Sequence, residues 1–149
     1  MSTSDIIVDE SCFPLVFLTF PPQVDAEMVT KFCARYDRML DRGRPFANVT
    51  DVTLVTERPA ATIRKQLAEW SRSNDARMVK LSRGDARVVR SSLIRGAMTA
   101  VGWLHKPKTP EEWFSSKEDA IAWAIKQLDD ARVPIPSAVR ERFTMRTAT

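Results

Sequence analysis

The sequence of 149 residues has few of the residues that usually carry chemistry, and it has no long apolar run. The longest such run, residues 13–20, is interrupted by Pro14 and Thr19, whereas a membrane-spanning helix needs roughly 20 apolar residues. The N-terminal segment, residues 1–5, has neither the basic start nor the apolar stretch of a signal peptide. We therefore expect no membrane span, a cytoplasmic location and, from the length, a single domain.

The scarcity of glycine, histidine and cysteine limits the possible active sites. The four glycines are too far apart to form a phosphate-binding loop or a dinucleotide fingerprint. His105 is the only histidine, and no established metal-site spacing joins it to Cys12 and Cys33. We expect His105 to be a polar or cationic group at a helix C-terminus and both cysteines to be reduced and buried. The sequence thus predicts no catalytic residue, no cofactor, no metal and no enzymatic activity.

Charge is distributed unevenly along the chain, although the total is only +4. Residues 58–108 contain 12 basic and 3 acidic side chains, a net charge of +9, whereas residues 1–57 carry −4 and residues 109–149 carry −1. A basic middle segment predicts a surface for an acidic partner, or else only the solvated faces of helices. Because no helix-turn-helix, zinc finger or RNA-stacking motif accompanies it, we do not expect a nucleic-acid partner.

Hydrophobic periodicity predicts alternating strands and helices. The expected strands cover residues 6–10, 14–20, 45–55, 86–89 and 112–114. The expected helices cover residues 25–40, 56–82, 91–104 and 115–130. Their expected N-caps are Asp25, Thr56, Ser91 or Ser92, and Ser115, and Gly84 is expected to end the second helix. This order, ββαβαβαβα, predicts a single-domain α/β sandwich with a mixed sheet of about five strands and about four helices. We expect the domain to span residues 5–130 and residues 131–149 to be a tail that can form one short helix.

Two features of the predicted helix over 91–104 concern its packing. Gly96, Ala97 and Ala100 are small, which predicts a close approach of this helix to the sheet. Trp103 lies off the apolar stripe of the helix, so it could be an exposed interface anchor or could pack between helices.

Three segments, residues 48–55, 88–96 and 114–123, resemble the STAS-like superfamily of anti-sigma-factor antagonists and cytoplasmic domains of sulfate transporters. The resemblance implies an α/β regulatory domain. In the antagonists a serine that follows an aspartate, at the start of the helix after the third strand, is phosphorylated to switch partner binding. This chain has Thr56 and Glu57 at those two positions, so the resemblance does not carry the phosphorylation switch over.

We expect a non-enzymatic regulatory or scaffolding module that binds another protein or associates with itself. The candidate partner-binding residues lie at the predicted helix start and in the basic segment: Thr56, Glu57, Arg58, Arg64, Arg72 and Arg83. The alternative is a carrier or sensor of a small apolar ligand or lipid, which a lipid-carrier-like variant group of the superfamily implies. That alternative requires a sizeable cavity, whereas the many bulky apolar residues predict a filled core.

Overall fold

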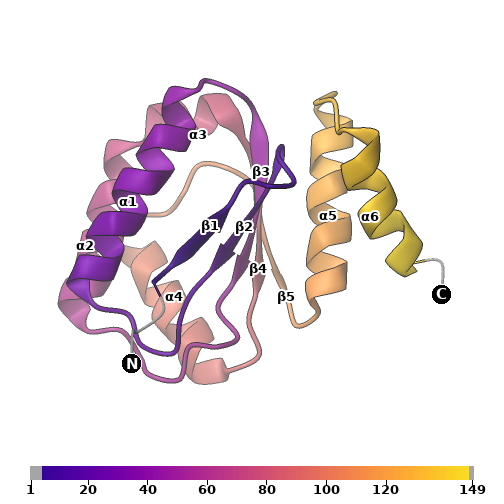
Figure 1. Cartoon of the computed structure of the whole chain (residues 1–149). Coiled ribbons are helices and arrows are strands. Elements are labelled where there is room, and N and C mark those ends of the chain that lie inside the picture. The colour runs from indigo at the N-terminus through magenta and orange to yellow at the C-terminus, as the bar shows by residue number, and fades with distance from the viewer. Residues whose placement is uncertain (1–4, 148–149) are drawn as a thin grey trace.

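The structure, a computed structural model, describes residues 5–147, which form three layers. Helices α1 to α4 cover one face of the central sheet, and α5 and α6 cover the other (Figure 1). The strands are β1 (Ile7–Asp9), β2 (Leu15–Thr19), β3 (Phe46–Asp51), β4 (Ser82–Val88) and β5 (Glu111–Phe114). The helices are α1 (Ala26–Asp41), α2 (Ala61–Ser73), α3 (Asp75–Leu81), α4 (Ser92–Leu104), α5 (Lys117–Asp130) and α6 (Ser137–Thr147).

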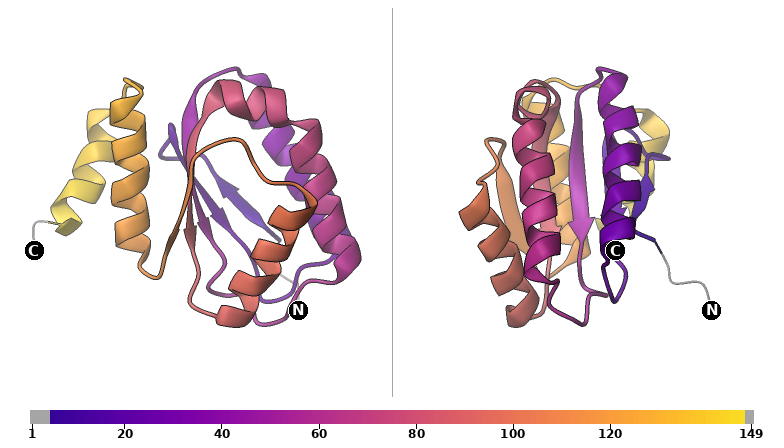
Figure 2. Two further views of the ribbon diagram at one scale, coloured as in Figure 1. Left: turned by 180° about the vertical axis from the view of Figure 1, so that it is seen from behind. Right: turned by 90° about the vertical axis from the view of Figure 1, so that its left-hand side faces the viewer.

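The sheet runs in sequence order, β1-β2-β3-β4-β5, with β1 antiparallel to β2 and all other neighbours parallel. Right-handed crossovers that always advance in the same direction put their helices on one face. Accordingly, α1, α2 and α4 lie side by side on that face (Figure 2). The predicted α/β class and mixed five-stranded sheet are confirmed. Among the described residues there are six helices instead of about four, and none is long and apolar enough to cross a membrane.

The sheet separates two hydrophobic cores. Strand residues alternate between its faces, so that Ala47 and Val49 of β3 pack toward α5, whereas Phe46 packs toward α1. Cys12 is buried on the α5 side, whereas Cys33 is only partly buried on the α1 side, so the expected burial is confirmed for Cys12 alone; both are free thiols. Burial, with a smaller contribution from the charge of Asp37, raises the pKa of Cys33 to about 11. With the sheet between them, the two cysteines cannot join in the native fold.

The predicted helix over residues 56–82 is wrong at its start and in its middle. The structure has α2 and α3 there, separated at Asn74, whose buried side-chain amide donates a hydrogen bond to the Trp70 carbonyl (3.0 Å). A side chain that bonds to the preceding turn competes with the regular helical pattern. Gly84 does not end a helix but lies inside β4. A Cβ atom at Gly84 would stand 2.8 Å from Cη2 of Trp123 in α5, so close packing of α5 requires a glycine here.

The expected short helix in residues 131–149 is α6, which packs against the α5 side of the sheet. Its Val139 and Phe143 are buried in that core, and the Phe143 ring lies 5.7 Å from the ring of Phe17 in β2. Arg140 forms an ion pair with Asp129 at the end of α5 (2.7 Å). Residues 148–149 of the expected tail lie outside the described residues.

Candidate ligand-binding site

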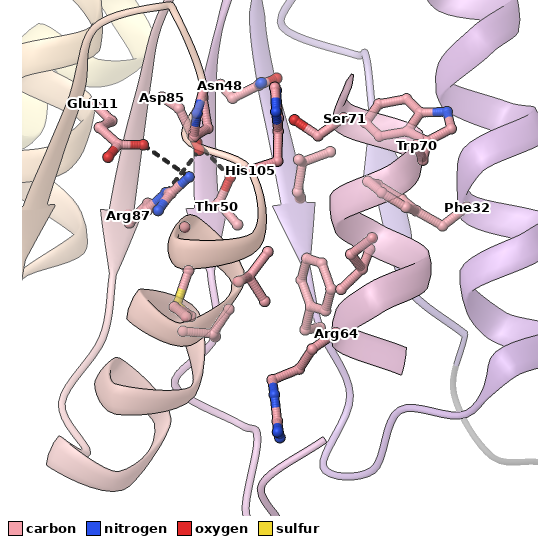
Figure 3. A pocket seen from close by; sticks show the side chains of 18 of the residues that line it. Phe32, Asn48, Thr50, Arg64, Trp70, Ser71, Asp85, Arg87, His105 and Glu111 are labelled. Carbon is pink, nitrogen blue, oxygen red and sulfur yellow. Dashed lines mark hydrogen bonds and ion pairs between the residues drawn. The ribbon is translucent and has the colours of Figure 1, made fainter. Parts of the chain in front are cut away.

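A cavity of about 210 Å³ lies between the sheet and the helices α1, α2 and α4 (Figure 3). The expectation of a filled core is therefore wrong on this face. Most of the cavity wall is apolar, and its residues come from the sheet and from the helices α1 to α4. The apolar residues of the wall include Leu18, Phe20, Phe32, Tyr36, Leu67, Trp70, Met78, Ile94, Ala97, Met98 and Val101.

The cavity exists because α4 packs on the sheet mainly through its first half. Ile94 joins a small cluster with Val52, Val55 and Val89 at the carboxyl ends of β3 and β4. The second half of α4 continues over the cavity, where Val101 is only half-buried. The expected close approach through small residues is wrong for Gly96, which is exposed and has open space where a Cβ would stand.

The sheet forms a polar floor beneath these apolar walls. Parallel register places Asn48, Asp85 and Glu111 in one row across β3, β4 and β5. The next row on the same face contains Thr50 and Arg87, followed by Trp113 in β5. Adjacent strands are about 4.8 Å apart, so neighbours in a row are within reach of direct hydrogen bonds. Both rows lie on the α1 side of the sheet, together with apolar strand residues such as Val16, Leu18 and Phe46.

Arg87 lies at the centre of an ionic network on this floor. Its Nε donates to Oδ2 of Asp85 (3.0 Å), and its Nη2 is 3.0 Å from Oε2 of Glu111. Thr50 Oγ1 donates to the other oxygen of Asp85 (2.6 Å). Burial alone would lower the pKa of Arg87, but the two carboxylates outweigh burial and raise it. Arg87 thus remains a cation facing two anions, and these three side chains carry a net charge of −1.

Two oxygen atoms on the floor lack hydrogen-bond partners among the described residues. Asn48 is only 3% exposed, and its Nδ2 donates to the Tyr36 hydroxyl (2.6 Å), but its Oδ1 accepts nothing. Oε2 of Glu111 is buried and accepts no hydrogen bond, and its partner is the ion-paired Nη2 of Arg87 at 3.0 Å. A buried acceptor without a donor costs about 1–3 kcal/mol. A ligand that donates hydrogen bonds here would remove that cost.

One end of the cavity is bounded by a link between α4 and α3. His105 is the C-cap of α4, and its Nε2 lies 2.8 Å from Oδ1 of Asp75 in the first turn of α3. The expected position of His105 at a helix C-terminus is confirmed. Lys108 lies 3.9 Å from the same carboxylate and is largely exposed. Within the described part of the chain, no group of three histidine, cysteine or acidic side chains could hold a metal ion.

Thr56, Glu57 and Arg58 are exposed in the loop between β3 and α2. The Thr56 hydroxyl donates to the Pro22 carbonyl (3.3 Å) instead of capping a helix. Glu57 accepts a hydrogen bond from Gln23 (3.1 Å). Since α2 begins at Ala61, Glu57 does not lie in its first turn. The interpretation of these three residues as a helix start is wrong.

The three predicted arginines have different surroundings. Arg64 lines the cavity, and its Nη1 donates to the Pro59 carbonyl (2.6 Å). Arg72 is exposed on α2 and donates to the Leu104 carbonyl at the end of α4 (2.6 Å). Arg83 is half-buried in β4. The structure thus brings Arg64 to the cavity and Arg72 to the end of α4, and places Arg83 on the sheet.

The polar floor was missed by sequence reasoning, although a signal for it exists. A central parallel strand is covered on both faces and is therefore apolar at nearly every position. Asn48 and Thr50 break this rule in β3, as do Asp85 and Arg87 in β4. Polar residues at every second position of neighbouring buried strands indicate a polar patch on one face of the sheet.

No family model matches this chain, and no curated protein matches it. The resemblance to the STAS-like superfamily therefore depends on the three sequence segments alone. The function has to be inferred from the cavity and from the surfaces around it.

Proposed function

We propose that this chain is a binding module that holds a small, largely apolar molecule in the cavity beneath α4. One observation carries the proposal: a cavity of about 210 Å³ combines apolar walls with a polar floor on which buried acceptors lack donors. A cavity of about 150 Å³ in another protein binds benzene, so this one can hold a ring with a short polar substituent. The proposal adopts the carrier or sensor role and includes no chemical step. Together with the STAS-like resemblance, the proposed ligand binding suggests that the chain is a regulatory domain that acts in the cytoplasm.

A cavity-filling substitution tests this proposal. Ala97 is buried and lines the cavity from α4, so Ala97→Leu would put an isopropyl group into the space that the ligand needs. We expect the variant to weaken the binding of indole, an apolar ring probe, by about tenfold or more, which corresponds to about 1.4 kcal/mol. Isothermal titration calorimetry measures this loss.

Thr99→Leu is the matched control, because Thr99 is exposed on the same helix and does not line the cavity. It should leave indole affinity within about twofold of the original protein. Equal affinities for indole in Ala97→Leu and in the unchanged protein would contradict the proposed site.

A second candidate function, binding to another protein or to a second copy of this chain, is supported by the outer surface of α4. Trp103 is 82% exposed, and Leu93 and Leu104 are exposed on the same helix. Exposed tryptophans are frequent anchors of protein interfaces. Because Arg72 donates to the Leu104 carbonyl, a basic side chain adjoins this apolar surface, which suits a partner with acidic residues around an apolar centre.

Two substitutions test the second function. Trp103→Ser should weaken association with the partner by about tenfold or more, whereas Arg72→Glu should mainly slow association and reduce its sensitivity to salt. Arg38→Glu, an exposed change on α1, is the charge-reversal control and should have neither effect. Surface plasmon resonance on the isolated partner, or sedimentation for self-association, measures these changes. Association that is unchanged in both Trp103→Ser and Arg72→Glu would exclude this surface.

A further inference from the structure

We infer that the ligand of this cavity is an amine: an apolar ring or short chain that carries a positively charged nitrogen. The inference depends on the proposed binding function and specifies the chemistry of its ligand. It follows from three properties of the cavity, namely the charge of its floor, the unpartnered acceptors there and the aromatic side chains of its wall.

The charge of the floor favours a cation. Asp85 and Glu111 contribute two carboxylates, and Arg87 contributes the one guanidinium that lies between them. These side chains are mostly shielded from water, with Arg87 only 15% exposed, so their excess negative charge is weakly screened. A ligand ammonium beside Glu111 would bring the group to neutrality. A ligand carboxylate would add a third anion beside an arginine whose Nε and Nη2 already face carboxylates.

The hydrogen-bonding capacity of the floor also favours a donor. Oδ1 of Asn48 is buried and accepts no hydrogen bond. Oε2 of Glu111 is ion-paired with Arg87 but also accepts no hydrogen bond. Asp85 lies between these two residues in the same row, with both its oxygens already accepting hydrogen bonds. An ammonium group has up to three N–H donors and no acceptor, so it can satisfy acceptors of this kind without creating a new unpartnered one.

Aromatic side chains form the wall on the α1 and α2 side of the cavity. Phe32, Tyr36 and Trp70 contact one another, with ring centroids 5.2–5.9 Å apart. Aromatic walls accept apolar rings, and their faces also attract cations. Besides Arg87, two cationic side chains line the cavity, and each has a partner other than Glu111: Arg64 donates to the Pro59 carbonyl, and Lys108 is largely exposed beside Asp75.

A series of three probes of similar size tests the inference on the unchanged protein. These are 2-phenylethylamine, 2-phenylethanol and phenylacetate, which present a cation, a neutral hydroxyl and an anion on the same ring. Calorimetry at pH 7 and low salt should show that the amine binds about tenfold or more tightly than the alcohol, and that phenylacetate binds most weakly. Equal affinities for amine and alcohol, or tightest binding of phenylacetate, would overturn the inference.

A substitution on the floor provides the second test. Glu111→Gln keeps the shape of the side chain but removes its charge, so it should weaken 2-phenylethylamine binding about tenfold and leave 2-phenylethanol binding within about twofold. Glu112→Gln is the matched control, because Glu112 is the next residue of β5, exposed and on the opposite face. An unchanged amine affinity in Glu111→Gln would contradict the assignment of the amine to this carboxylate.

The two levels of the proposal fail in different ways. If indole and 2-phenylethanol bind in the cavity but the amine has no advantage, the ligand class is wrong while the binding function stands. If neither indole nor any of the three phenyl probes binds the unchanged protein, the proposed function is contradicted and the inference falls with it.

Discussion

Replacing Arg87 with methionine is expected to lower the free energy of unfolding by about 3–5 kcal/mol. The substitution keeps much of the side-chain volume but leaves Asp85 and Glu111 together on the floor without the cation that lies between them. Removing one partner of a buried ionic group is costly because the remaining charges have lost their water and gain no compensating contact. Urea denaturation followed by circular dichroism measures the change.

Arg95→Met is the control for this prediction. The guanidinium groups of both arginines lie over the Trp113 ring, at 5.3 Å for Arg87 and 5.1 Å for Arg95, but Arg95 is exposed on α4. Its loss should change stability by no more than about 0.5 kcal/mol. If the two variants lose similar, small amounts of stability, the ionic floor is not an important element of the fold.

The second large effect is expected at Gly84. Gly84→Ala should destabilise the protein by about 1–3 kcal/mol, because the new methyl group would stand 2.8 Å and 2.9 Å from two ring atoms of Trp123. Trp123 packs against the core on the α5 side, so it can move only by disturbing that contact. Thermal and chemical unfolding of the variant measure the loss.

The same substitution at Gly96 should have the opposite sign. Gly96 is exposed within α4 with nothing near the position of its Cβ, and alanine is favoured over glycine inside a helix by about 0.5–1 kcal/mol.

A Gly84→Ala/Trp123→Leu double variant should lose less stability than the sum of its two single variants, because the shorter side chain removes the clash. Strict additivity would contradict the close contact.

Local signals in the sequence predict several helix starts correctly. Asp25 is the predicted cap of the first helix, and Ser91 or Ser92 that of the third; in the structure Asp25 and Ser91 accept from the backbone N–H groups of Met28 and Ile94. The last predicted cap is wrong by one residue, because Ser116 rather than Ser115 caps α5. Such signals act over a few residues, and so they can be recognised without knowing the rest of the fold.

The cavity could not be predicted in the same way. Its existence depends on the distance between α4 and the sheet, which is set by contacts of Ile94 with residues that follow β3 and β4. Trp103 shows the same limit. Periodicity places it off the apolar stripe of its helix, which allows either an exposed position or packing between helices. Its exposure in the structure excludes packing between helices. The polar floor could be predicted in part. Asn48 and Thr50 are polar residues in a strand that is expected to be apolar, and this is visible in the sequence. Their proximity to Glu111 follows only from the strand register of the structure.

A crystal structure of the protein grown with 2-phenylethylamine tests the binding function most directly. We expect the phenyl ring among Phe32, Tyr36 and Trp70, and the ammonium nitrogen within hydrogen-bonding distance of Glu111 and Asn48. A structure in which α4 lies directly on the sheet, side chains fill the cavity and no probe is bound would contradict the proposed function.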